Sequence, residues 1–260
     1  MFENRLATVR FVGALGLVIA GIAGTVTLKH ETTVVSPELQ QVAAEAAPAS
    51  DYIDRASLDN FIDNPAGTQL TFVRLSDGEH LGSSTERFPR PALSLIKLYV
   101  ADYVLLKGTE DEKQLALEMI KSSDDEVAAE LVEEYPDAIE ATARTYSLWS
   151  TEAGESWGTS RTSTYDAVKF LRAKIESDPN SPLLEAMRES HEVANDGYEQ
   201  DFGTATLPGV KGTKWGWSND RMLHSSISFG DDFVVAAAVL GSAEDLTDLV
   251  ERQVAPHLAR

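Results

Sequence analysis

A serine and a lysine stand three residues apart in the segment Ser94-Leu95-Ile96-Lys97. The segment opens an apolar run from Leu93 to Leu106 that is typical of a buried helix, so both side chains would lie on one helical face. A serine hydroxyl attacks a carbonyl when a neighbouring base accepts its proton, and an amine that burial holds neutral can be that base. Without further residues, such a pair is more often a serine near a helix start followed by an exposed lysine.

Two other polar residues could complete this chemistry. Ser123 lies in a predicted loop between two helices, where its hydroxyl could relay a proton to a leaving amine. Lys214 lies on a predicted strand, where its positive charge could hold Lys97 neutral and bind a substrate carboxylate. These four side chains would form the catalytic group of an acyl-transfer enzyme, with Ser94 as the nucleophile.

The backbone around the same strand could stabilise the developing negative charge. Gly216 has no side chain, so the strand could approach a ligand closely. The backbone amides of Ser94 and Trp217 could then donate hydrogen bonds to an oxyanion. The Ser94 amide would also lie at a helix N-terminus, where negative charge is favoured.

Hydrophobic periodicity and turn residues predict the elements that must position these groups. Two strands joined by the turn Asp77-Gly78 come first, helices follow, and three strands and a helix end the chain. The predicted helices cover 57–62, 93–106, 112–121, a segment after 125, 165–175, 184–187 and 244–257. The predicted strands cover 69–75, 79–83, 209–217, 224–229 and 233–240. This order predicts an α+β fold, in which the N- and C-terminal segments build one antiparallel sheet with a helical lobe inserted between them.

Composition excludes several functional classes. The formal charge of −20 argues against nucleic-acid binding and against adhesion of the folded domain to anionic lipid. There is no cysteine, and the five histidines are scattered, so neither a disulfide nor a zinc-type cluster is expected. No phosphate-binding glycine loop is present. We therefore expect no cofactor and no metal.

The N-terminal region differs from the rest of the chain. Two arginines precede an uncharged stretch from Phe11 to Leu28, which is long enough to span a bilayer. Alternatively, it is a signal peptide cleaved near Gly21-Ile22-Ala23. We expect an anchor or signal peptide over 1–30, a flexible tether over 31–50 and a folded domain over 51–260. The domain would then be extracellular, either held at the cell membrane by a single span or secreted.

Three short motifs follow one another along the chain: Ser94-Leu95-Ile96-Lys97, Ser123-Asp124-Asp125 and Lys214-Trp215-Gly216. They resemble the S-x-x-K, S-D-N and K-T-G motifs of penicillin-binding proteins and class A β-lactamases. The chain looks most similar to exported actinobacterial serine hydrolases of the class A β-lactamase-like group. This resemblance covers about Gln69 to Leu240. It implies a β-lactamase/transpeptidase-like fold and an acyl-enzyme at Ser94, formed from cell-wall peptide or a related amide or ester.

Two departures from the motifs affect substrate binding. Asp125 replaces an asparagine whose amide donates to a substrate carbonyl, whereas a carboxylate only accepts. Trp215 replaces a hydroxyl residue that helps to bind a substrate carboxylate in the family. We assign Asp125, Trp215, Gly216 and Trp217 to substrate or oxyanion binding, with these two substitutions altering specificity.

The base that hydrolyses the acyl-enzyme in class A β-lactamases has no clear counterpart. Glu152 and Glu155 lie in the corresponding region, but the usual pattern is missing, and both are typical of solvated surface residues. We therefore do not expect efficient β-lactamase activity. The alternative is a catalytically silent binding or scaffolding module at the cell envelope, which would keep the fold without turnover.

Overall fold

The computed structural model of this protein describes residues 61–62 and 67–258. The predicted anchor or signal peptide over 1–30 and the predicted tether over 31–50 lie outside these residues. Within the described part of the chain, no helix is long and apolar enough to cross a bilayer.

Helices and strands follow one another as an α+β fold. The strands are β1 (Phe61–Ile62), β2 (Gln69–Arg74), β3 (His80–Ser83), β4 (Arg90–Pro91), β5 (Arg161–Thr162), β6 (Val210–Trp217), β7 (Leu223–Gly230) and β8 (Phe233–Leu240). The α-helices are α2 (Ile96–Lys107), α3 (Glu110–Ser122), α4 (Asp125–Glu134), α5 (Ala138–Tyr146), α6 (Thr164–Ser177), α7 (Pro182–Arg188), α8 (Ala243–Gln253) and α9 (Ala255–Leu258). Short 3₁₀ turns are η2 (Leu93–Leu95), η3 (Trp157–Thr159) and η4 (Gly203–Thr206).

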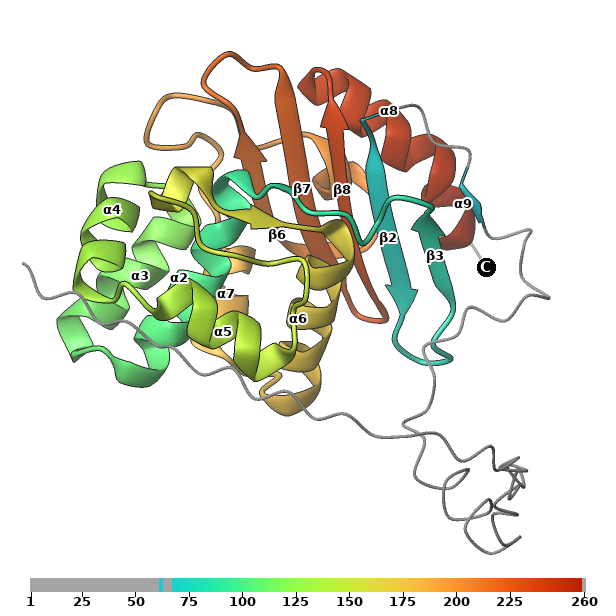
Figure 1. Ribbon diagram of the computed structural model, residues 1–260. Coiled ribbons are helices and arrows are strands. Elements are labelled where there is room, and N and C mark those ends of the chain that lie inside the picture. Colours follow the sequence, from blue (N-terminus) through green and yellow to red (C-terminus); the bar gives the residue numbers. More distant parts are fainter. Residues whose placement is uncertain (1–60, 63–66, 259–260) are drawn as a thin grey trace, which may run out of the picture. The chain divides into compact units, whose positions relative to one another are not determined.

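Strands from both ends of the described chain form the main sheet, in the order β1-β3-β2-β8-β7-β6. All neighbours are antiparallel except β1 and β3, which run parallel. Strand β2 pairs with β8 along its whole length, from Gln69 opposite Ala238 to Arg74 opposite Phe233. The helical lobe lies between these segments in sequence, and Figure 1 shows it beside the sheet in green and yellow. This arrangement confirms the predicted fold class.

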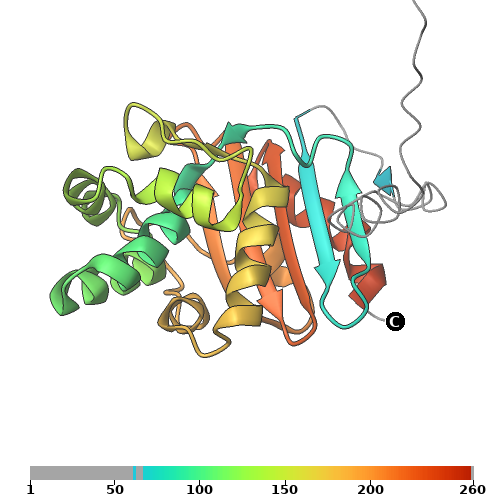
Figure 2. The ribbon, with the colours of Figure 1, turned by 60° about the horizontal axis from the view of Figure 1, so that its bottom comes forward.

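Helices cover both faces of the sheet and create two hydrophobic cores. Figure 2 shows α6 lying across one face, and Figure 1 shows α8 on the other. Side chains alternate along β8: Val234 and Ala236 belong to the core on the α6 side, and Val235 and Ala237 to the core on the α8 side. Alternate residues of one strand therefore contribute to the hydrophobic cores on the two faces of the sheet. It also gives β6 two opposite faces, which decides where its residues point.

Helix α2 carries the first motif through the middle of the helical lobe. In its first turns, from Ile96 to Ala101, buried residues surround the helix instead of forming one stripe, whereas Leu106 and Lys107 at its end are exposed. Tyr99 is completely buried, meets the ring of Phe170 edge to face at 5.0 Å, and shares a hydrogen bond with the Thr162 hydroxyl. The predicted helix from Leu93 to Leu106 is confirmed. It begins as the 3₁₀ turn η2.

Two local predictions need correction. Helix α5 lies where the sequence predicted no element, shortly after Pro136, a residue type that commonly ends a helix. Its apolar residues Ile139 and Ala143 occupy one helical face and enter the core. The predicted helix over 57–62 was also wrong at its end, because Phe61 and Ile62 pair with β3 as a strand. The rest of that segment lies outside the described residues.

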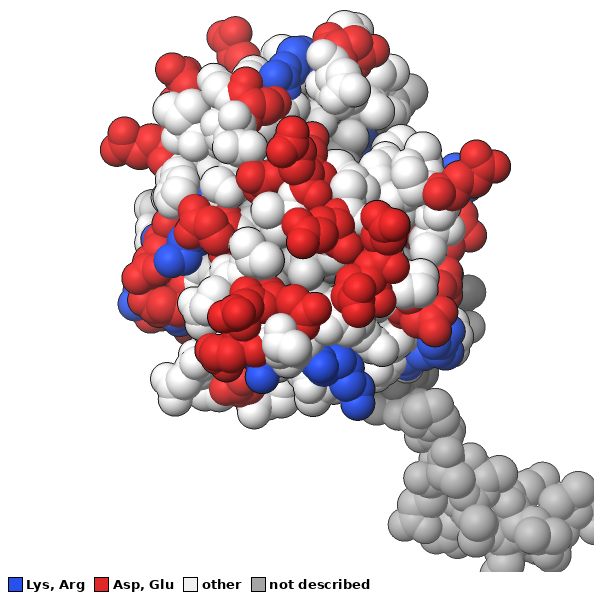
Figure 3. Space-filling view, turned by 90° about the vertical axis from the view of Figure 1, so that its left-hand side faces the viewer, with Lys and Arg blue, Asp and Glu red and all other residues white. Residues whose placement is uncertain are grey.

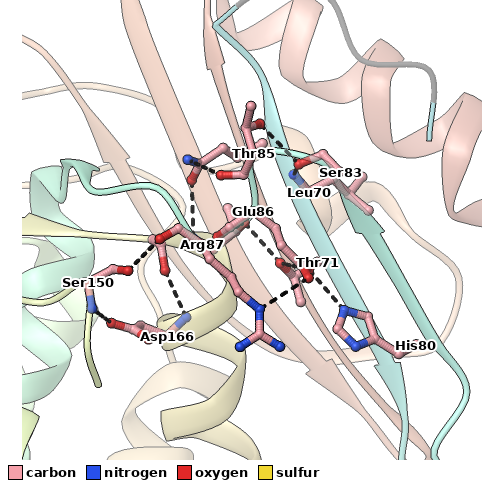
Figure 4. A network of polar contacts seen from close by, with 12 residues as sticks. Leu70, Thr71, His80, Ser83, Thr85, Glu86, Arg87, Ser150 and Asp166 are labelled. Atoms are coloured by element: carbon pink, nitrogen blue, oxygen red, sulfur yellow. Dashed lines mark hydrogen bonds and ion pairs between the residues drawn. The ribbon is translucent and has the colours of Figure 1, made fainter. Parts of the chain in front are cut away.

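A buried carboxylate joins the sheet to α6 (Figure 4). Glu86 is 4% exposed, and its Oε2 accepts hydrogen bonds from the Thr71 hydroxyl at 2.9 Å and shares one with His80 Nε2 at 2.9 Å. Its backbone carbonyl accepts from the amide of Tyr165 at 3.1 Å. A buried charge with such partners is costly to disturb. It fixes the segment that leads into the first motif.

Candidate functional site

The turn η2 presents Ser94 in a constrained backbone conformation. Leu93, the preceding residue, has a φ of 54°, which is uncommon for a branched side chain and costs about 1–3 kcal/mol. The amide of Ala92 donates to the carbonyl of Ser160 at 3.0 Å, which ties the turn to the segment before β5. Ser94 itself is buried. Such stored strain is typical of functional sites, and no pattern in the sequence predicted it.

Strand β6 passes directly beside the Ser94 backbone. A Cβ atom at Gly216 would lie 2.8 Å from the Ser94 nitrogen and 2.8 Å from Leu93 Cβ. Real side chains do not approach so closely, so only glycine fits here. The sequence predicted that Gly216 lets the strand approach a ligand. In the structure the close neighbour is Ser94.

The Lys97 amine is completely buried and has three hydrogen-bond partners. Its Nζ donates to the Ser123 carbonyl at 2.6 Å and to Asp125 Oδ1 at 2.5 Å, and it lies 3.5 Å from the Ser123 hydroxyl. The indole of Trp157 lies above the amine, with 4.9 Å between Nζ and the ring centroid. The first and second motifs therefore meet, as their order in the sequence suggested.

Ser123 joins the two lysines. It ends α3 with a φ of 57°, a left-handed conformation that turns the chain sharply into α4. Its hydroxyl accepts a hydrogen bond from Lys214 Nζ at 2.7 Å. Lys214 comes from β6 and is completely buried. Three segments far apart in the sequence thus bring two amines to one hydroxyl.

Burial dominates the electrostatics of both lysines. Desolvation lowers the pKa of Lys97, while the carboxylate of Asp125 opposes that shift. Desolvation, reinforced by the charge of Lys97, lowers the pKa of Lys214 well below its usual value. Both amines therefore lose their protons more readily than a lysine in water. A neutral amine is the form that a general base requires.

The segment from Thr151 to Ser160 supplies Trp157 but no carboxylate to the lysines. Glu152 forms a salt bridge with Arg161, with 3.5 Å between Oε1 and Nη1, and both side chains are exposed. Glu155 is exposed as well. Neither has a hydrogen bond to Ser94, Lys97 or Ser123 in the described residues. No motif in the sequence predicted that Trp157 would lie at the site.

A second segment, from Ser190 to Asp201, packs against the loop of the second motif. The amide of Asn195 donates to the Ser122 carbonyl at 2.7 Å. Asp196 accepts from the indole of Trp217 at 2.9 Å and from Arg221 Nη2 at 3.1 Å. This segment holds no familiar motif, so the sequence did not indicate its contribution. These contacts involve the side chain of Trp217. Its backbone amide stays a predicted donor to the oxyanion.

The structure corrects the prediction for the Trp215 side chain. Its indole donates to the Phe202 carbonyl at 2.9 Å and lies in the core beneath α8. Because neighbouring residues of a strand point to opposite faces, Trp215 faces away from Lys214. It therefore replaces a hydroxyl residue without filling the site. Asp125, by contrast, lies at the site, where its side chain is 62% exposed.

The assembled group suits acyl transfer to a serine. The Ser94 backbone lies against β6, and Lys97, one helical turn further on, shares the Ser123 hydroxyl with Lys214. In the described residues, no hydrogen bond joins the Ser94 hydroxyl to Lys97 or Ser123, and such contacts often form only with substrate bound. No group of three or more His, Cys, Asp or Glu side chains within the same residues is arranged to hold a metal ion.

Comparisons with known proteins identify the fold. No protein-family model and no curated protein sequence match the chain. Among solved structures, a D-alanyl-D-alanine carboxypeptidase from Mycobacterium tuberculosis is similar with a TM-score of 0.56 and 18% identity, covering 76% of this chain and 92% of that one. A β-lactamase from Desulfarculus baarsii gives a TM-score of 0.60 and 14% identity, covering 75% and 93%. A cefotaxime-bound penicillin-binding protein from Listeria monocytogenes gives 0.55 and 16%, covering 72% and 95%.

Proposed function

We propose that this chain, which has the fold of the β-lactamase and penicillin-binding protein superfamily, is a serine hydrolase that works through an acyl-enzyme at Ser94. Its substrates would be cell-wall peptides or related amides and esters. The observation that carries the proposal is the meeting of two completely buried amines, Lys97 and Lys214, on the hydroxyl of Ser123. A fully buried amine is rare unless it is paired, and pKa values that burial and a charged neighbour shift strongly cluster at functional sites.

The proposed reaction has two steps. Ser94 Oγ bonds to the substrate carbonyl carbon while its proton moves to Lys97. The bond to the leaving nitrogen or oxygen then breaks as the Ser123 hydroxyl gives its proton to the leaving group and takes up the proton held by Lys97. Water later attacks the acyl-enzyme and restores the serine. Lys214 donates a hydrogen bond to the Ser123 hydroxyl and holds it in place for the proton transfer to the leaving group.

The acyl-enzyme of this mechanism should be long-lived with penicillins. Glu152 is engaged by Arg161, and no other carboxylate of the segment from Thr151 to Ser160 contacts the site. Hydrolysis of the acyl-enzyme would therefore lack a dedicated base. This supports peptidase-type chemistry over efficient β-lactamase activity.

Intact mass spectrometry tests the proposal directly. The full chain is incubated with a penicillin and, separately, with a small fluorophosphonate, beside the variant Ser94→Ala. The expected result is one stable added mass in the wild type and none in the variant. The absence of an adduct with both reagents would overturn the proposal.

The second candidate is a silent binding module with the same fold. The observation in its favour is that Lys97 donates to Ser123 and Asp125 and not to Ser94. A protein of this kind would bind a cell-wall peptide without an adduct and without cleavage. Equilibrium binding combined with the absence of acylation would support it over the hydrolase.

Export is part of the proposal on sequence grounds. The uncharged stretch from Phe11 to Leu28 and the positive residues before it support a domain outside the cytoplasm. Whether the stretch anchors or is cleaved is tested by N-terminal sequencing of the mature protein. A cytoplasmic protein with an intact N-terminus would contradict export.

A further inference from the structure

The contact between Lys97 and Asp125 links a buried amine to solvent. Lys97 is completely buried, whereas the side chain of Asp125 is 62% exposed. One carboxylate oxygen, Oδ1, lies 2.5 Å from the amine, and the other has no hydrogen-bond partner among the described residues. Asp125 therefore stands where an incoming substrate can meet it while it touches the proposed base.

The other charged groups near Lys97 are engaged elsewhere. Asp124 caps α4, since its Oδ1 accepts from the amides of Glu126 and Val127 at 2.8 and 3.0 Å. Asp196 is held by Trp217 and Arg221 and acts on Lys97 through space. Lys214 is directed at Ser123. Asp125 is the carboxylate that contacts the Lys97 amine directly in the described part of the chain.

The hydrogen-bond geometry fits a resting state of Lys97. The amine makes two short contacts, to the Ser123 carbonyl and to Asp125, and both partners are acceptors. An ammonium placed against a carboxylate keeps its proton more firmly than an amine without such a partner. Burial acts in the opposite direction, so the charge of Asp125 decides how much of the base is available.

We propose that Asp125 is a positioning residue that holds the Lys97 amine as an ion pair in the resting protein, and that a substrate releases the amine by offering a cation to the same carboxylate. This inference rests on the proposed hydrolase function. A substrate ammonium would share the charge of Asp125, so Lys97 would give up its proton more easily once the right substrate is bound. A substrate carbonyl would instead meet the lone pairs of the carboxylate.

The surface around Asp125 has the sign that such a substrate requires. Between Glu110 and Glu134 the sequence contains ten acidic residues and two lysines. Figure 3, which views the molecule from the side of the helical lobe, shows acidic side chains spread over this face with few basic ones between them. Such a field attracts cationic ligands and repels anionic ones. The cations of the site, Lys97 and Lys214, are buried and do not offset it at the surface.

The variant Asp125→Asn tests the inference, because it removes the charge with little change in shape. The matched control is Glu126→Gln, which removes a neighbouring exposed carboxylate that does not contact Lys97. The full chain is assayed with the p-nitrophenyl ester of 6-aminohexanoate, which carries an ammonium, and with its N-acetylated form, which does not. For each protein, kcat/KM is measured from about pH 5 to 10.

The expected results have definite signs. With the acetylated ester, the acid limb of the wild-type profile should lie at higher pH than that of Asp125→Asn, by about one unit or more. The wild type should prefer the ammonium ester by about tenfold, and Asp125→Asn should lose that preference. Glu126→Gln should behave as the wild type in both respects. Asp125→Ser serves as a second variant without the charge if asparagine disturbs the start of α4.

Fluorophosphonate labelling distinguishes a failure of the role proposed for Asp125 from a failure of the hydrolase function. If Ser94 is labelled but the acid limb and the preference are unchanged in Asp125→Asn, this inference is overturned and the hydrolase function stands. If Ser94 is labelled in neither protein, the proposed function fails and this inference fails with it. A shifted acid limb together with a lost preference supports both.

Discussion

Gly216 lies so close to Ser94 that a Cβ atom at Gly216 would be 2.8 Å from the Ser94 backbone nitrogen. The variant Gly216→Ala must therefore displace β6 or the turn η2. We expect the acylation rate of Ser94 to fall by about 10- to 100-fold, because small errors in the position of a nucleophile are costly. Stability should fall by about 1–3 kcal/mol. A time course of intact mass and a urea denaturation curve measure both.

The matched control for this change is Gly158→Ala. A Cβ atom at Gly158 would meet nothing within 4 Å. Its stability and acylation rate should stay close to those of the wild type. An acylation rate in Gly216→Ala equal to that of Gly158→Ala would show that the close contact has no role in reactivity.

The tryptophan above the Lys97 amine should matter for reactivity. In Trp157→Leu the amine loses the aromatic face 4.9 Å away and part of its cover from water. We expect acylation of Ser94 to slow by about tenfold, since this contact is worth about 1–2 kcal/mol. Trp149→Leu is the control, because Trp149 is 88% exposed. Equal rates in the two variants would exclude a role for Trp157.

Stability should rise with pH because of the buried lysines. The pKa values of Lys97 and Lys214 in the folded protein lie below the usual 10.5, so they lose their protons before the same groups in the unfolded chain do. Between each lowered pKa and 10.5, the unfolded state binds more protons, and the free energy of unfolding increases with pH. In Lys214→Met this increase should be smaller.

Urea denaturation at about pH 7 and pH 9 checks this expectation. Lys107→Met is the control, because Lys107 is exposed and its removal should leave the increase unchanged. Lys214→Met should also be folded and unreactive, since methionine keeps much of the buried volume without the amine. An identical pH dependence in wild type and Lys214→Met would contradict the lowered pKa of Lys214.

The buried carboxylate of Glu86 should support stability without taking part in the reaction. Glu86→Ala leaves the Thr71 hydroxyl and the His80 ring without their shared acceptor. We expect a loss of about 2–4 kcal/mol in the free energy of unfolding. Glu133→Ala, at an exposed position of α4, should change it by less than about 0.5 kcal/mol. Thermal unfolding measures the difference, and equal losses would argue against the network.

Much of this fold could be predicted from periodicity and turn residues. Alternating side chains indicated β2, and the turn at Asp77-Gly78 indicated its pairing with β3. Three closely spaced apolar segments indicated β6, β7 and β8. Helix α5 was missed because a proline suggested the end of a region, although Ile139 and Ala143 lie on one helical face. Local propensity did not reveal that this face would be buried.

The site was predictable only where its residues form motifs. The meeting of Lys97, Ser123 and Lys214 followed from three motifs in order. Asp196 contributes from a segment with no motif, and its contacts depend on a fold that brings it to β6. The orientation of Trp215 could not be predicted. A strand pattern shows that successive side chains point to opposite faces of the sheet, but it does not show which face lies toward the site.

Because β2 pairs with β8, parts of the fold can form only in a certain order while the chain is synthesised. Strand β2 is synthesised before the helical lobe, whereas its neighbour β8 begins only at Phe233. The same is true of Ser94, whose neighbour Gly216 follows the whole helical lobe along the chain. A nascent chain on the ribosome therefore carries its nucleophile without the strand that supports it. The pairing of β2 with β8 and the contact of Ser94 with β6 can therefore form only after the helical lobe has been synthesised.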